Sequence, residues 1–308
     1  MGGGSTLNTS KSMNITVFTA TYNRAYSISH LYQSLLHQSC NDFEWMIVDD
    51  GSVDNTEELI QSFVCENKIL IRYIKQENGG KHRAINKGVQ EAKGELFFIV
   101  DSDDYLADNA IERVLFYYNT IKNNVLFGGV CGCKSYFSGG RVGGKVCFLE
   151  LDCNVLDLRY KHKVKGDMAE VYKKDILKKY SFPEYDDEKF CPEALIWNRI
   201  AQKYQLRFFN EPIYFCEYLN DGLTSKIVEL RMNSPLASMD TYSELSMHHI
   251  PYLQKYKAAI NFWRFSFNTK KISLRMKLKK IGYLKTIISF PLGFIMYLND
   301  IRKKERRI

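Results

Sequence analysis

Three aspartates fall within four positions of the chain, at Asp101, Asp103 and Asp104, directly after an apolar run. Carboxylates this close repel one another, and the alternate spacing of Asp101 and Asp103 can direct two of them toward one point. Hard divalent cations such as Mg²⁺ and Mn²⁺ bind oxygen ligands and often use one or two carboxylates together with substrate phosphates. The spacing therefore indicates a metal site in contact with a diphosphate. The alternative interpretation is structural, because an acidic cluster ahead of a helix at 110–118 stabilises that helix N-terminus without a metal.

Two further polar motifs also allow a structural and a chemical interpretation. Asp49-Asp50-Gly51-Ser52 follows a second apolar run and suits either a turn before a helix or a carboxylate that accepts a nucleobase N–H. Asn78-Gly79-Gly80-Lys81 suits either a helix entry or a set of amides and one ammonium group facing phosphate. The sequence contains neither the GxxxxGK[ST] pattern of an ATPase loop nor the GxGxxG pattern of a dinucleotide fold. Neither of those nucleotide-binding classes is therefore supported.

The elements that position these motifs alternate between strand and helix in the first half of the chain. Strands are predicted at 14–20, 43–48, 69–74 and 95–100, with amphipathic helical patterns between them. Such alternation is typical of βαβ units and a mainly parallel sheet flanked by helices. Ligands of these sheets bind at the carboxyl ends of the strands, where the polar motifs fall. We therefore predict an α/β fold with its site along that edge.

The second half of the chain is less regular, and its pattern becomes helical and amphipathic after Thr224. We expect a hairpin between 127–137 and 145–151, helices near 169–180 and 192–204, and a strand at 206–214. The predicted organisation is a Gly/Ser-rich leader or flexible tail over 1–12, an α/β domain over 13–224, and a helical, basic amphipathic extension over 225–308.

The charge of the chain is concentrated near its C-terminus. The 308 residues have a formal net charge of +8, yet 264–308 alone contain 13 Lys+Arg and 2 Asp+Glu, which leaves 30 basic and 33 acidic residues elsewhere. A nucleic-acid-binding protein would have its basic residues across a binding face, so this distribution argues against nucleic acid as a partner. The eight cysteines include no CxxC pair, which predicts reduced thiols in a cytoplasmic protein.

The basic extension surrounds an uncharged stretch of 14 residues, Thr286–Asn299. A helix that spans a bilayer needs ~20 apolar residues, so this stretch is too short to cross one alone. Basic clusters at 275–280 and 302–307 suit anionic lipid headgroups, and we expect peripheral attachment to the inner face of the cell membrane through 264–308. The alternative is a helical hairpin that packs on the α/β domain, with solvated basic ends.

Four motifs taken together, in order and at strand ends, give a specific resemblance. They are VFTATYNR at 17–24, IVDDGSVDNT at 47–56, NGGKHRAINKG at 78–88 and GELFFIVDSDDYL at 94–106. In these motifs the chain resembles the family 2 inverting glycosyltransferases of the GT-A fold, of the bacterial surface-polysaccharide type. The resemblance extends over roughly 13–223 and is strongest up to Leu106.

The resemblance implies roles for individual residues. Asp103 would be the principal ligand of Mn²⁺ or Mg²⁺, with Asp101 beside it. Asp50 would hydrogen-bond the base of the nucleotide. The other residues assigned to the nucleotide are Thr19, Tyr22, Asn23, Lys81, Asn86, Asp101 and Ser102.

The resemblance leaves the catalytic base less certain than the nucleotide site. An inverting displacement needs a base within reach of the acceptor hydroxyl. In many relatives this is the Asp of a Glu-Asp pair opening a late helix, and here that position is Ala194, so the chain departs from the pattern. Glu193 is the candidate base and Asp167 the second candidate, while a first-turn carboxylate that only stabilises the helix is the structural alternative for Glu193.

These observations predict a metal-dependent glycosyltransferase. It would transfer a sugar from a nucleotide donor, with UDP-sugars favoured, to a hydroxyl of a glycan or lipid-linked acceptor. Two other functions stay open at this stage. One is a binding module that kept the nucleotide pocket without catalysis. The other is a sugar-1-phosphate nucleotidylyltransferase, which would need a Gly-rich loop near the first strand that this sequence lacks.

Overall fold

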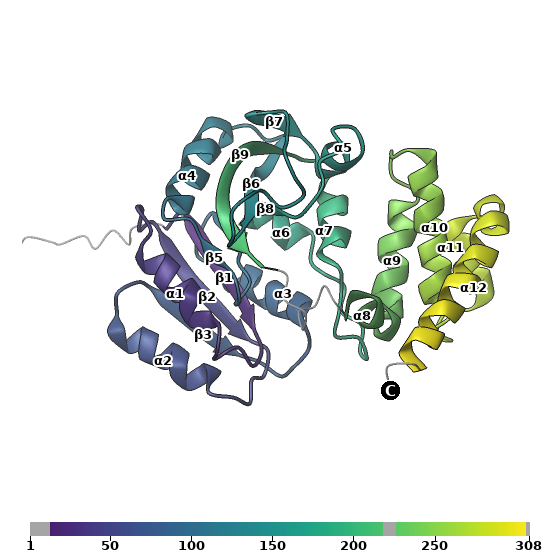
Figure 1. Ribbon diagram of the computed structural model, residues 1–308, viewed down its shortest axis with the longest axis horizontal. Coiled ribbons are helices and arrows are strands. Elements are labelled where there is room, and N and C mark those ends of the chain that lie inside the picture. The colour runs from purple at the N-terminus through teal and green to yellow at the C-terminus, as the bar shows by residue number, and fades with distance from the viewer. Residues whose placement is uncertain (1–12, 218–225, 306–308) are drawn as a thin grey trace, which may run out of the picture.

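The computed structural model describes residues 13–217 and 226–305 (Figure 1). Its strands are β1 (Ile15–Thr21), β2 (Phe43–Asp49), β3 (Ile71–Lys75), β4 (Leu96–Ile99), β5 (Tyr105–Leu106), β6 (Phe127–Tyr136), β7 (Glu150–Cys153), β8 (Met168–Lys173) and β9 (Gln205–Cys216). Its helices are α1 (Ile28–Leu36), α2 (Thr56–Glu66), α3 (Lys81–Glu91), α4 (Ala110–Ile121), α5 (Val155–Tyr160), α6 (Lys174–Lys179), α7 (Glu193–Ile200), α8 (Ile227–Asn233), α9 (Pro235–Leu245), α10 (Tyr252–Ser266), α11 (Leu274–Ile281) and α12 (Tyr283–Glu305).

All described strands belong to one sheet, in the order β3-β2-β1-β4-β8-β6-β9-β5, with β7 added to β9. The pairs β3–β2, β2–β1 and β1–β4 are parallel, as the alternation of strands and helices predicted. Beyond β4 the sheet continues through antiparallel pairing with β8. The carboxyl ends of β1, β2 and β4 therefore meet at one edge of the sheet.

Helices cover both faces of the sheet and form its two cores. One core contains Leu31, Phe63 and Tyr118, from α1, α2 and α4. The other contains Ile85, Leu177 and Ile196, from α3, α6 and α7. Alternate strand residues point to opposite faces, so β1 contributes its odd-numbered apolar positions to the first core and Phe18 to the second.

Two predictions for the second half of the chain were wrong. The expected hairpin does not form, because β6 is paired on one side with β8 and on the other with β9, while β7 pairs with β9. The expected helix at 169–180 is strand β8 up to Lys173 and helix α6 only from Lys174. Pairing of β8 with both β4 and β6 outweighs the local helical pattern, since it buries Val171 and Tyr172 inside the sheet.

The helices α9 to α12 form a group at one end of the molecule, beside α7 and α8 (Figure 1). The Glu188 carboxylate accepts hydrogen bonds from the N–H groups of Leu236 and Ala237 at the start of α9, and Arg199 of α7 forms a two-bond ion pair with Glu244. These contacts fix the helical group to the α/β part. The predicted leader (1–12) and the predicted domain boundary at 224 lie outside the described residues, so both stay predictions.

Candidate active site

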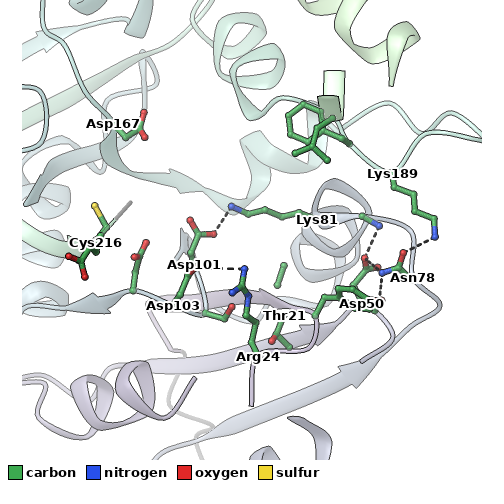
Figure 2. Close-up of a pocket in the computed structure, with 18 of the residues that line it drawn as sticks. Thr21, Arg24, Asp50, Asn78, Lys81, Asp101, Asp103, Asp167, Lys189 and Cys216 are labelled. Atoms are coloured by element: carbon green, nitrogen blue, oxygen red, sulfur yellow. Dashed lines mark hydrogen bonds and ion pairs between the residues drawn. The ribbon is translucent and has the colours of Figure 1, made fainter. Parts of the chain in front are cut away.

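A cavity of about 360 Å³ opens at the sheet edge where β1, β2 and β4 end (Figure 2). Tyr22, Asp50 and Asp101 follow the three strands and contribute to its wall, and Lys81 contributes from the first turn of α3. These residues lie together because parallel strands end at the same edge of a sheet. Figure 2 shows Asp101 between Asp50 on one side and Asp167 on the other.

Asp101 is the centre of the charged groups in this cavity. Its Oδ1 lies 2.5 Å from the Lys81 Nζ. Burial raises the pKa of Asp101, but the positive charges of Lys81 and Lys134 outweigh this effect and lower the pKa to about 2. Burial likewise lowers the pKa of Lys81, and the carboxylates of Asp101 and Glu193 reverse that effect and raise it. Asp101 is therefore a carboxylate at neutral pH.

Asp103 is less well compensated than Asp101. Its nearest cation is Arg24, whose guanidinium lies 3.9 Å from the carboxylate. Burial and the negative charge of Asp101 raise the pKa of Asp103 above its ordinary value. Two neighbouring carboxylates that repel each other at the wall of a cavity are stabilised by a cation that both can ligate. The donor set of Asp101 and Asp103, oxygens only, fits Mg²⁺ or Mn²⁺.

Asp104, the third aspartate of the cluster, has a structural role. Its side chain is buried and accepts a 2.6 Å hydrogen bond from the Tyr214 hydroxyl. The same Tyr214 oxygen accepts a hydrogen bond from the backbone N–H of Asp101. Burial and the charge of Asp101 raise the pKa of Asp104 to about 7. This pair fixes the 101–104 segment to β9.

Glu193, the candidate base, lies beside Lys81. It is the first residue of α7, and its carboxylate is 2.7 Å from the Lys81 Nζ. Lys81 thus joins Asp101 and Glu193, which are 92 positions apart in sequence. Glu193 is not among the described residues that form the cavity wall, but its carboxylate contacts the same ammonium group as Asp101 does.

The Asp50 carboxylate organises the wall that carries Lys81. One oxygen accepts bonds from the Gln76 side chain and the N–H of Gly79, and the other from the Asn78 side chain and the N–H of Gly80. A carboxylate has about four acceptor positions, and these four donors occupy them. A nucleobase N–H would have to displace a side-chain amide, so its contact with Asp50 stays a prediction.

Gly80 must be glycine for this wall to pack. Its φ is +99°, and an added Cβ would lie 1.9 Å from the carbonyl oxygen of Lys189. The segment that leads into α7 therefore rests directly on the turn before α3. This contact holds Glu193 close to Lys81.

Three more of the residues predicted for the site, Tyr22, Ser102 and Asp167, contribute to the cavity wall. Three other residues predicted to contact the nucleotide do not line the cavity, and their positions correct the prediction. Thr19 is fully buried and accepts a hydrogen bond from the Trp45 indole, because its place in β1 directs it into the core.

Asn23 and Asn86 also make contacts that keep them from the cavity. The side-chain oxygen of Asn23 accepts from the Val53 N–H and thereby joins the loops after β1 and β2. Asn86 exchanges hydrogen bonds with the backbone of Phe182 through its amide, because its position on α3 faces the 182–184 segment. Both residues support the site from outside.

The structure adds residues that sequence reasoning missed. Arg24 belongs to the TYNR motif, and its charge beside a polar loop was the available signal. Lys134 lies in β6 with its ammonium 3.8 Å from the centre of the Tyr214 ring, and contributes to the cavity wall. A lysine within an otherwise buried strand was a weak signal. For Leu230 of α8 the sequence offered no signal, since its place in the cavity wall depends on how the helical group packs on the α/β part.

Metal-ligating groups are sparse in the described part of the chain. Among residues 13–217 and 226–305, no group of three or more His, Cys, Asp or Glu side chains is arranged to hold a metal ion. The two-carboxylate set is therefore the candidate, with further ligands from a bound substrate. By its sequence the segment 218–224 suits either a lid over the nucleotide or a plain exit from the preceding strand, and it lies outside the described residues.

Residues 16–145 match the family model of glycosyl transferase family 2, and this segment contains the four motifs and most of the cavity. Over these residues the chain is similar to the family 2 glycosyltransferases. The glycosyltransferase GlyG of Streptococcus pneumoniae is 38% identical over 101 residues, which cover 32% of this chain and 33% of GlyG. The chain spans about a third of the length of the curated relatives that it matches.

Solved structures resemble this chain over nearly its whole length. S. aureus TarS in complex with UDP has a TM-score of 0.60 at 18% identity, over 94% of this chain and 88% of that chain. The mannosyltransferase PcManGT from Pyrobaculum calidifontis, in complex with GDP-Man and Mn²⁺, has a TM-score of 0.56 at 16% identity, over 93% and 87%. Identities this low concern the fold alone. The predicted GT-A fold is confirmed.

Proposed function

We propose that the protein is a metal-dependent glycosyltransferase that transfers a sugar from a nucleotide donor to a hydroxyl of a glycan or lipid-linked acceptor, with inversion. One observation carries the proposal. Two metal-suited carboxylates and a lysine lie together in the wall of one cavity at the ends of the parallel strands, and the lysine also contacts the Glu193 carboxylate. The family 2 match supports the reaction class. The UDP named with TarS supports a UDP-sugar as donor.

Asp103 and Asp101 would hold Mn²⁺ or Mg²⁺. When bound, such a cation neutralises the charge that develops on the departing nucleoside diphosphate. The Mn²⁺ named with PcManGT supports this assignment. Lys81 and Arg24 contribute positive charge beside the two aspartates and would attract the donor diphosphate to the same place.

Glu193 would accept the proton of the acceptor hydroxyl as that oxygen attacks the sugar. The Lys81 ammonium orients the Glu193 carboxylate through the 2.7 Å contact. Asp167 is the second candidate, because it contributes to the cavity wall. Tyr22 and Ser102 would contact the donor, since both contribute to the same wall at the strand ends.

The experiment measures nucleoside diphosphate release over a panel of sugar nucleotides, with and without Mn²⁺, for the natural chain and Asp103→Asn. The exposed Asp186→Asn serves as the matched control, since it makes the same chemical change outside the cavity. Release that requires both the metal and Asp103 supports the proposal and identifies the donor. Release that persists in Asp103→Asn without metal contradicts metal dependence. Tight nucleotide binding without turnover for any donor and acceptor favours a binding module.

A further inference from the structure

The C-terminal helix α12 has two chemically distinct faces. Its inner face packs on α10 through Ser289 and Gly293, which are buried. Gly293 allows this contact, because an added Cβ would lie 2.6 Å from the Trp263 Cβ. The buried Asp300 then pairs with Arg264 of α10 at 2.6 Å. The orientation of α12 is thus fixed along much of its length.

The outer face of α12 is apolar and exposed. Its side chains are solvent-accessible by 81% at Leu284, 70% at Ile287, 53% at Ile288, 45% at Leu292 and 54% at Ile295. Ile287 and Ile288 follow Leu284 by three and four positions, Leu292 follows Ile288 by four, and Ile295 follows Leu292 by three, so the five side chains form one stripe along the helix. At 1.5 Å per residue the stripe is about 17 Å long. Apolar residues aligned in this way mark an interaction surface rather than scattered exposure.

Basic side chains flank this stripe, and two groups of them can be told apart: those that make contacts inside the helical group and those that are exposed without an ion pair. Arg264 and Lys280 are used inside the helical group, in ion pairs with Asp300 and Asp240. Lys277 is also used there, and donates to backbone carbonyls. Within 267–305, the exposed cations that have no ion pair among the described residues are Lys270, Arg275, Lys279, Arg302, Lys303 and Lys304. They lie before the stripe, on and around α11, and after it, at the end of α12.

We infer that α11 and the outer face of α12 form a docking surface for an anionic lipid bilayer. Apolar side chains enter the boundary between headgroups and acyl chains, and the basic side chains at both ends meet negative headgroups. Charge favours this occupant over a second copy of the chain. A twofold interface would bring together two copies of the basic side chains that flank the apolar stripe, and these charges would repel.

The helices lie along the membrane surface rather than across it. No single helix among the described residues is long and apolar enough to span a bilayer, and α11 and α12 satisfy that requirement only jointly, with a bend of 111° between them. The Arg264–Asp300 ion pair further opposes insertion, because it would carry two charges into the hydrocarbon layer. The inference concerns location and does not depend on the proposed reaction.

The test measures co-sedimentation of the full-length protein with phosphatidylcholine vesicles and with vesicles that contain about one third phosphatidylglycerol. We expect binding only to the anionic vesicles, and its loss at high salt, where the Debye length falls to about 3 Å. Changing Arg302, Lys303 and Lys304 together to Gln should weaken the partition coefficient about a hundredfold, at roughly fivefold for each basic residue. Ile287→Asn with Ile295→Asn should weaken it at least tenfold.

Matched controls make the same changes elsewhere on the surface. Lys161, Lys178 and Lys179 changed to Gln remove three exposed charges from the α/β part, and Val125→Asn with Leu149→Asn changes two exposed apolar residues there. Both control variants should bind as the natural chain does. Absence of binding to anionic vesicles at low salt overturns the inference. Equal losses of vesicle binding in the test and control variants also overturn the inference. So does a dimer that sedimentation velocity detects in the natural chain and that Ile287→Asn converts to a monomer.

Discussion

Replacement of Glu193 by Gln tests the carboxylate that contacts Lys81 beside the cavity. Gln keeps the shape of the side chain and removes its charge and its ability to accept a proton. A general base contributes ~10²–10⁴-fold to turnover. We therefore expect Glu193→Gln to reduce kcat by that factor.

The structure sets the size of the accompanying effect on nucleotide binding. Glu193 is 35% exposed and Lys81 is 28% exposed, so water screens their ion pair. Exposed pairs are worth about 0.2–1 kcal/mol, which corresponds to at most about a fivefold change in affinity. Lys81 also keeps its 2.5 Å contact with Asp101 in this variant. Binding and turnover should thus respond to Glu193→Gln by very different factors.

The assay pairs steady-state diphosphate release with calorimetric titration of UDP. Glu184→Gln is the matched control, because Glu184 is exposed and contacts Asn86 outside the cavity. Turnover in Glu193→Gln within tenfold of the natural enzyme would refute Glu193 as the base. A large loss in Asp167→Asn in that same case would assign the base to Asp167.

Two further predictions concern the wall and the acidic cluster. Gly80→Ala should destabilise the protein by about 3 kcal/mol through strain and the contact with Lys189, whereas Gly139→Ala, also at positive φ but in open space, should cost about 1 kcal/mol. Equal thermal midpoints for the two variants would contradict this. The pKa of Asp104 is raised to about 7 in the folded chain. Between about pH 4 and pH 7 the folded chain therefore keeps a proton that the unfolded chain has released. The free energy of unfolding should fall as pH rises through that range. Asp104→Asn keeps an acceptor for the Tyr214 hydroxyl but cannot titrate. In metal-free thermal melts the loss of stability between pH 5 and pH 8 should therefore be smaller in this variant. An unchanged pH dependence would contradict this assignment to Asp104.

The fold of the first half followed from local pattern. Strands and helices from β1 to β4 each carry their own periodicity and turn signals, so their order and parallel pairing could be predicted. The strands from β6 onward could not, because β6 and β8 are placed by partners distant in sequence. The helical pattern at 169–180 misled the prediction, since sheet pairing decides the state of such ambiguous apolar segments.

The sequence by itself determined the resemblance to the family 2 glycosyltransferases, the α/β fold and the position of Asp50, Lys81, Asp101 and Asp103 near one sheet edge. Motifs at the ends of parallel strands converge whatever the details of packing. Only the tertiary structure decided which way individual side chains point. Thr19 lies in the core although Thr21, on the same face of β1, contributes to the cavity wall, because Thr21 is at the end of the strand and Thr19 is inside it.

Tertiary structure also decided which distant charges meet. Lys134 arrives from β6 and Glu193 from α7, and neither has a local pattern that specifies its partner. Their places depend on how later strands and helices pack on the first four. The physical reason is that local interactions fix an element and its ends, whereas contacts between distant side chains exist only once the core has assembled.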